Sequence, residues 1–135
     1  MNAQSETTPP GDAGEGKTTM AISREMVALM KDYFGRGPTK ARTYMRDNLI
    51  VVIMEDTMTK AELTLVRSGN IREVRDLRRL FQETIRDDAC ELVERLSGRT
   101  VSAYMSDHDT ERDVAAEIFV MDPASGDADT GTVRE

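Results

Sequence analysis

The sequence has very few of the side chains that form cross-links and metal sites: one cysteine, Cys90, and one histidine. A lone cysteine excludes an intramolecular disulfide. A structural zinc site, which is built mostly from Cys and His, is not expected. A Cys-His nucleophile pair is not expected either, because Cys90 falls within an expected helix and has no neighbour in the sequence that would activate its thiol.

Long hydrophobic runs are also absent, and none approaches the roughly 20 residues that a helix needs to cross a bilayer. The longest, LIVVIM at residues 49–54, has the length of a strand. The N-terminal MNAQSETTPP lacks the basic start and apolar centre of a secretory signal. We therefore expect a cytoplasmic protein without direct membrane insertion, which reaches the inner face of a membrane only through a partner.

Tryptophan is missing and aromatic residues make up 4% of the chain, whereas methionine occurs nine times. This composition predicts a core of Leu, Ile, Val and Met, in which flexible thioethers fill irregular gaps. A length of 135 residues suits one domain with a single core.

The net charge of −7 is unevenly distributed. Residues 36–106 hold 13 Lys and Arg against 11 Asp and Glu, a net charge of +2, while the flanks hold 5 against 14, a net charge of −9. A nucleic-acid-binding domain normally carries a basic patch on its folded part. The small central excess does not indicate one, so we do not expect nucleic acid as the partner.

The two ends of the chain are polar and lack apolar periodicity, so they cannot bury enough apolar surface to offset the entropy of ordering. We predict disordered tails at residues 1–19 and 123–135. The single domain should span residues 20–122, in which no internal repeat is found.

The first half of the domain predicts a helix and a hairpin. Apolar residues at helical spacing indicate a helix over residues 22–34, which Gly35 should end. Gly35 and Gly37 are both suited to left-handed backbone conformations. Residues 40–46 alternate as a half-buried strand with a basic outer side, and residues 49–54 read as a strand covered on both faces.

The second half predicts two helices and a second hairpin. Thr59 and Glu62 have capping-box spacing for a short helix, and residues 71–97 form a long amphipathic helix that Gly98 stops. Two strands follow, with inward residues Val101, Ala103 and Met105 in the first and Val114, Ala116, Ile118 and Val120 in the second. The order α-ββ-αα-ββ predicts a two-layer α+β fold, with a four-stranded, mostly antiparallel sheet and helices on one face.

Residues 11–18, GDAGEGKT, match the P-loop pattern G-x-x-x-x-G-K-[ST], in which backbone amides cradle phosphates. A P-loop follows a buried strand and opens a helix, whereas the polar SETTPP precedes this segment. We interpret it as a flexible glycine-rich tail. A nucleotide-binding enzyme is accordingly the least favoured of three function hypotheses.

Residues 107–113, DHDTERD, carry alternating oxygen ligands like those of a calcium loop. An EF-hand requires glycine where this chain has Arg112. We interpret the segment as the polar tip of a hairpin and expect no metal site.

Basic residues gather on two segments. Those on the long helix have acidic neighbours in the sequence and are expected to form a solvated, salt-bridged face; they are Arg72, Arg75, Arg78, Arg79 and Arg86. Those on the glycine turn and first strand are less balanced and are the best candidates for an anionic ligand or partner; they are Arg36, Lys40, Arg42 and Arg46. The exposed side of this strand could equally pack against a second copy, so we expect a homo-oligomer, in the simplest case a dimer.

Four segments in this order resemble the MpsC-like proteins: FGRGPTKARTYMRDNLIVVIMED, MTKAELTLVRSGNIREVRDLRRLF, LVERLSGRTVSAYMSD and VAAEIFVMD. The resemblance covers about residues 22–122, and its most specific pieces are GRGP at residues 35–38 and T-x-A-E at residues 59–62. The family is named after a sodium-translocating, membrane-potential-generating system. The resemblance implies a soluble accessory component, encoded with membrane subunits related to a cation-translocating complex and linked to inorganic-carbon supply. It implies no catalytic residues and no cofactor.

Our first hypothesis is therefore a non-enzymatic accessory or regulatory subunit whose partners are membrane transport-complex subunits. The alternative is a stand-alone sensor module that binds an anion, such as bicarbonate, or nucleic acid through the GRGP turn and the basic first strand. The same residues are the candidates for ligand or partner binding in both; they are Gly35, Arg36, Gly37, Pro38, Lys40, Arg42, Arg46 and Asp107.

Overall fold

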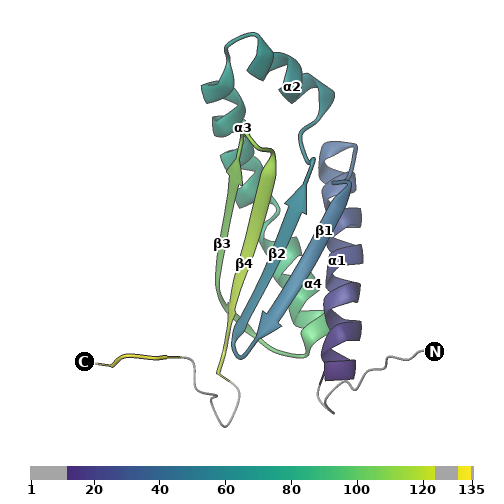
Figure 1. Cartoon of the computed structure of the whole chain (residues 1–135), viewed down its shortest axis with the longest axis vertical. Helices are drawn as coiled ribbons and strands as arrows, with labels where there is room; N and C mark the ends of the chain where they lie inside the picture. Colours follow the sequence, from purple (N-terminus) through teal and green to yellow (C-terminus); the bar gives the residue numbers. More distant parts are fainter. Residues whose placement is uncertain (1–11, 124–130, 135) are drawn as a thin grey trace, which may run out of the picture.

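The computed structural model describes residues 12–123 and 131–134 (Figure 1). Within them the chain forms four helices and one four-stranded sheet, which confirms the predicted α+β class. The elements, in order, are α1 (Asp12–Phe34), β1 (Lys40–Arg46), β2 (Leu49–Glu55), α2 (Lys60–Arg67), α3 (Ile71–Thr84), α4 (Arg86–Ser97), β3 (Val101–Asp109) and β4 (Val114–Met121).

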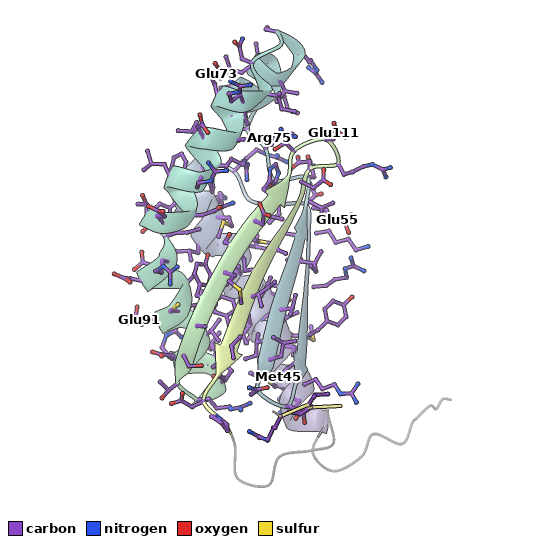
Figure 2. All side chains as sticks on the ribbon, turned by 90° about the vertical axis from the view of Figure 1, so that its left-hand side faces the viewer. Met45, Glu55, Glu73, Arg75, Glu91 and Glu111 are labelled. Carbon is purple, nitrogen blue, oxygen red and sulfur yellow. The ribbon has the colours of Figure 1, made fainter. Side chains whose placement is uncertain are left out.

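The sheet is fully antiparallel, with the strand order β1-β2-β4-β3. Two hairpins therefore meet along β2 and β4, and the most apolar strands occupy the centre. Helices α1 and α4 lie behind the sheet in Figure 1, while α2 and the start of α3 extend past its end. We call the sheet face that these helices cover the inner face and the opposite one the outer face. In the part of the chain that the structure describes, the helices lie on one side of the sheet (Figure 2).

Helix α1 packs on the inner face as its periodicity predicts. Ile22, Met26 and Met30 are buried, and Gly35 ends the helix with a φ of 84°. The helix begins earlier than predicted, so the predicted tail over residues 1–19 is wrong for residues 12–19. Once the packed part of a helix is formed, each added turn costs little, and the helix can extend beyond its apolar face. Residues 1–11, 124–130 and 135 of the two predicted tails lie outside the described residues, and residues 123 and 131–134 form neither helix nor strand.

The helical start of α1 also bears on the P-loop pattern. The hydroxyl group of Thr18 donates to the carbonyl oxygen of Gly14 at 3.0 Å, inside the helix. A helical backbone directs its amides along its own axis and cannot wrap them around a phosphate. Residues 12–18 therefore do not form the loop that nucleotide binding requires.

Strand β2 is covered on one face only, which corrects the prediction that both of its faces are buried. Ile50, Val52 and Met54 are at most 1% exposed on the inner face, whereas Leu49 is 40% exposed. The continuous apolar run is typical of a doubly covered strand, but no helix in the described residues lies over the outer face.

The predicted inward residues of β3 and β4 are mostly wrong. Ala115, Glu117, Phe119 and Met121 are the buried residues of β4, and in β3 Tyr104 is buried while Met105 is 50% exposed. Both faces of β4 are rich in apolar residues, so alternation alone could not choose between them, and a one-residue error exchanges the faces. Val101 does pack against the core as predicted, because the β3 register shifts between Val101 and Ala103.

The predicted long helix is divided at Ile85 into α3 and α4. The hydroxyl group of Thr84 donates to the carbonyl oxygen of Leu80 at 2.8 Å, a contact that often bends helices. Gly98 ends α4 in a left-handed conformation, as predicted. The Thr59–Glu62 capping box is confirmed in both directions.

Candidate functional site

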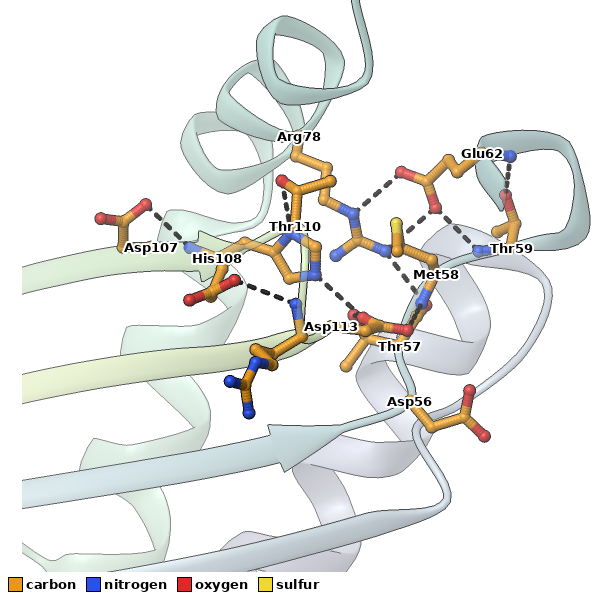
Figure 3. A network of polar contacts seen from close by, with 12 residues as sticks. Asp56, Thr57, Met58, Thr59, Glu62, Arg78, Asp107, His108, Thr110 and Asp113 are labelled. Carbon is orange, nitrogen blue, oxygen red and sulfur yellow. Dashed lines mark hydrogen bonds and ion pairs between the residues drawn. The ribbon is translucent and has the colours of Figure 1, made fainter. Parts of the chain in front are cut away.

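A buried ion pair lies where α2 and α3 meet the end of the sheet (Figure 3). Arg78 is 6% exposed and donates from Nε and Nη2 to the two oxygens of Glu62, at 2.9 and 3.0 Å. Its Nη2 also donates to the carbonyl oxygen of Thr57 at 3.0 Å, and its guanidinium lies 4.9 Å from the ring centroid of Phe34. Glu62 accepts from the Thr59 amide as well, so the helix cap and the ion pair share one carboxylate.

The carboxylate of Asp113 extends this network to the second hairpin. It accepts from the Thr57 hydroxyl at 2.8 Å, the Met58 amide at 3.0 Å and Nε2 of His108 at 2.9 Å. Burial raises the pKa of Asp113, but these hydrogen bonds outweigh it and lower the pKa below its usual value. Burial lowers the pKa of His108 in spite of the bond to Asp113. We call Thr57, Glu62, Arg78, His108 and Asp113 the Arg78 network.

A second buried carboxylate, Glu117, lies on the inner face of β4 and is 3% exposed. Tyr104 donates its hydroxyl hydrogen to one oxygen of Glu117, and Ser106 donates to the other at 2.8 Å. Burial raises the pKa of Glu117 to about 7, although these bonds and the charge of Arg78 act in the opposite direction. Glu117 is thus a buried group that can exchange a proton near neutral pH.

A small void connects the two clusters. It has a volume of about 20 Å³ and is lined in part by Arg78, His108 and Glu117. This volume is enough for about one water molecule, and the lining offers it several polar partners. The charge of Arg78 also lowers the pKa of Glu117, so the protonation of Glu117 is coupled electrostatically to the Arg78 network.

On the outward side of Arg78, a cleft of about 120 Å³ opens between α3 and β3, and Arg75, Arg79 and His108 help to line it. Its positive charge is partly balanced, since Arg78 pairs with Glu62 and Arg79 lies 3.6 Å from Asp76. Within residues 12–123 and 131–134, no group of three His, Cys, Asp or Glu side chains is placed to hold a metal ion. Burial raises the pKa of the Cys90 thiol, which disfavours the reactive thiolate.

The residues predicted as a binding site from the sequence separate into two groups. The GRGP turn lies beside the Arg78 network, because Arg36 donates to the carbonyl oxygen of Met58 at 2.6 Å and contacts Asp56 at 3.2 Å. The remaining four lie on the outer face, three on edge strand β1 and one on the opposite edge strand β3; they are Lys40, Arg42, Arg46 and Asp107.

The profile of a protein family described as the Na+-translocating membrane potential-generating system (MpsC) matches residues 15–123. The chain belongs to the MpsC family. It is also 28% identical, over 96 residues, to the uncharacterized protein YrhF of Bacillus subtilis (strain 168), which covers 70% of this chain and 79% of that protein. No solved structure matches it. The resemblance found in the sequence is confirmed, and the match starts inside the early part of α1.

The two segments that carry the resemblance to the MpsC-like proteins most specifically, GRGP and T-x-A-E, come together in the fold. Arg36 of GRGP donates a hydrogen bond to the carbonyl oxygen of Met58. The next residue, Thr59, begins the T-x-A-E segment, whose Glu62 forms the ion pair with Arg78. These positions therefore have a shared structural role, since they join the end of α1 to the start of α2.

The sequence interpretation missed Arg78, which it assigned to a solvated face. That assignment suits Arg79, whose side chain is 71% exposed, but Arg78 is buried. A signal was present, because Arg78 falls at helical spacing between the apolar Val74 and Phe81. Glu117 carried a similar signal, as it alternates with Ala115 and Phe119.

Gly37 is needed for a close approach and not for a left-handed backbone, which corrects the prediction for this residue. A Cβ atom there would lie 3.0 Å from Cγ1 and 3.1 Å from the carbonyl oxygen of Val27 in α1. We expect Gly37→Ala to lower the free energy of unfolding by about 1 to 3 kcal/mol, measured by urea denaturation.

Gly14→Ala is the matched control for Gly37→Ala. Gly14 lies in α1, and a Cβ atom added to it would meet no other atom within 4 Å, so alanine should raise the stability by roughly 0.5 to 1 kcal/mol. A Gly37→Ala protein that unfolds at the urea concentration of the wild type would show that α1 can move away from the turn.

Proposed function

We propose that this protein is a non-enzymatic accessory subunit that docks on the membrane components of a sodium-translocating, membrane-potential-generating system. The match to the MpsC family carries this proposal, because it spans residues 15–123 and so includes every strand and almost all of the helical part of the fold. In the described residues, no helix has both the length and the apolar character to cross a bilayer.

The exposed side of α3 is the surface that we assign to this docking. Leu77 and Leu80 lie one turn apart there and are 40% and 62% exposed. Two exposed acidic residues flank them, Glu73 and Glu83, and a third, Asp76, lies 3.6 Å from Arg79. Loops on the cytoplasmic side of membrane proteins are rich in Lys and Arg. An apolar pair with an acidic border is therefore complementary to such a loop.

The test is affinity purification of the tagged full chain from detergent-solubilised membranes of its own cells, followed by mass spectrometry. We expect integral membrane subunits of a cation-translocating complex to co-purify. Leu77→Ser/Leu80→Ser should reduce their recovery at least about tenfold, because burying each leucine contributes about 1.5 to 3 kcal/mol and a tenfold loss of affinity corresponds to about 1.4 kcal/mol.

Met20→Ser is the matched control, since Met20 is a 63% exposed apolar residue on α1 and lies away from α3. It should leave the recovery unchanged. If the wild type recovers no integral membrane protein, the accessory function is wrong. If the α3 variant recovers the same subunits as the wild type, the function stands but the docking surface is wrong.

A stand-alone module that binds an anion or nucleic acid has less support. Arg36 is engaged by Asp56 and by the Met58 carbonyl group, and Arg42 lies 3.2 Å from Glu55. The positive charge that the sequence places on the turn and first strand is thus partly balanced. If the protein takes part in inorganic-carbon uptake, it does so by docking on a membrane partner that carries out the uptake, so this role is part of the same proposal.

A further inference from the structure

The outer face of the sheet is apolar along its middle strands and carries opposite charges at its two edges. The middle is formed by Leu49, Val51, Ile53, Ala116, Ile118 and Val120. On edge strand β1 the outer residues are Lys40, Arg42, Tyr44 and Arg46, and on edge strand β3 they are Ala103, Met105, Asp107 and Asp109. Tyr44 is 53% exposed and Met105 is 50% exposed, so the apolar surface reaches both edges.

Strand register arranges these residues in rows across the sheet. Following the pairings from β1 to β3, Lys40 falls in one row with Asp109, Arg42 with Asp107, and Tyr44 with Met105. The two ends of a row are three strand spacings apart, about 14 Å, too far for contact within one chain. Lys40 and Arg42 thus each have an acidic counterpart on β3 in the same row that they cannot reach, whereas Arg46 shares its row with Ala103.

We propose that a second copy of this chain covers the outer face, related to the first by a two-fold axis parallel to the strands. Such an axis exchanges the edges of the sheet and keeps the rows in place. It sets β1 of one copy over β3 of the other, so that Arg42 faces the partner's Asp107, Lys40 faces the partner's Asp109 and Tyr44 faces the partner's Met105.

The charges select this axis over the alternative. A two-fold axis perpendicular to the strands would set β1 over β1 and β3 over β3, and would bring like charges together. Packed sheets cross at about 30°, which displaces the edge strands by roughly one residue, a distance that Arg and Lys side chains span. Arg42 contacts Glu55 of its own chain at 3.2 Å with a side chain that is 45% exposed, and it stays accessible to the partner.

The area of the outer face determines how tightly two copies of the chain are expected to bind. Four strands with about seven residues each cover an area of roughly 450 Å² in projection, which is below the roughly 800 Å² per partner of a standard specific interface and typical of a weak one. Apolar contacts at the centre and paired charges at both edges then support a dimer that forms at micromolar concentration. This inference does not depend on the membrane partner, which we assign to α3.

The test uses the full chain in sedimentation velocity from about 1 to 300 µM. The wild type should change from monomer to dimer within this range. Arg42→Glu and Asp107→Arg should each weaken the dimer at least about tenfold, because each variant sets like charges opposite one another twice per dimer. The double variant Arg42→Glu/Asp107→Arg should dimerise within about threefold of the wild type.

Mixing the two single variants gives the sharpest result. At the concentration where half of the wild type is dimeric, each variant alone should be mostly monomeric, while a mixture should form a heterodimer, since both of its charge pairs are then opposite in sign. Arg67→Glu, which reverses an exposed arginine on α2, is the matched control and should dimerise like the wild type. A wild type that stays monomeric to 300 µM overturns the proposal, and so do single variants that dimerise normally or a mixture that remains monomeric.

Discussion

Arg78→Met should lower the free energy of unfolding by about 3 to 5 kcal/mol, because it leaves the carboxylate of Glu62 buried and unpaired. Arg78 and Glu62 have side chains that are 7% and 4% exposed, and the contact is bidentate. Methionine retains most of the side-chain volume, so the loss reports the missing charge and hydrogen bonds and not a cavity. Urea denaturation followed by far-UV circular dichroism measures the change.

Two further variants separate the ion pair from other effects of losing an arginine. Arg79→Met removes a neighbour whose side chain is 71% exposed and should cost less than about 1 kcal/mol. Combining Arg78→Met with Glu62→Gln removes both charges, keeps an acceptor for the helix cap, and should regain at least half of the loss. A single Arg78→Met variant within about 1 kcal/mol of the wild type would mean that Glu62 finds another partner or is reached by water.

Glu117→Gln should abolish a pH dependence of stability that the wild type shows between pH 4.5 and about 7. The pKa of Glu117 rises from 4.5 to about 7 in the folded protein, chiefly because the group is buried. The folded state therefore binds a proton that the unfolded state has released, and stability falls as the pH rises through this window. The loss is on the order of 3 kcal/mol. Glutamine carries no ionisable group, so the Glu117→Gln protein should not show this loss of stability.

The effect of His108 on the pH dependence of stability is opposite in sign to that of Glu117. The stabilities of the wild type and of Glu117→Gln must therefore be compared at each pH. Its pKa is lowered in the folded state, and its contribution to stability is lost as the pH falls below 6.5. The difference in stability between Glu117→Gln and the wild type cancels this term and should grow by about 3 kcal/mol from pH 4.5 to 8. Urea denaturation at several pH values gives this difference.

Glu111→Gln, at the exposed turn between β3 and β4, tests whether loss of any carboxylate produces the effect. It should give no comparable divergence from the wild type. Parallel stability curves for Glu117→Gln and the wild type would show that Glu117 is already charged throughout this range, with water or Arg78 compensating its burial.

Features that depend on a few neighbouring residues could be predicted from the sequence. The capping box at Thr59 and Glu62, the helix end at Gly35 and the bounds of β1 all follow from local backbone geometry or strict alternation. The fold class followed as well, because the order of helical and alternating segments leaves few arrangements that bury every apolar face.

Features that depend on which surfaces meet could not be predicted. Both faces of β4 are apolar enough to be buried. The face with Phe119 is the buried one because helices pack against it and because Tyr104 and Ser106 donate hydrogen bonds to Glu117. In the sequence, Arg78 resembles the exposed arginines next to it. Its burial depends on Glu62 of α2, which lies against it only in the folded chain.

The class of the fold, the family and the positions of the turns could all be predicted from the sequence, since each of these is encoded over short stretches of chain. Packing between distant segments buries a carboxylate and an ion pair together, and it places basic and acidic residues at opposite edges of a sheet face that no helix of the described residues covers. Burial and register are set by contacts between distant segments. The residue pattern within one segment does not show which other segment of the chain will pack against it.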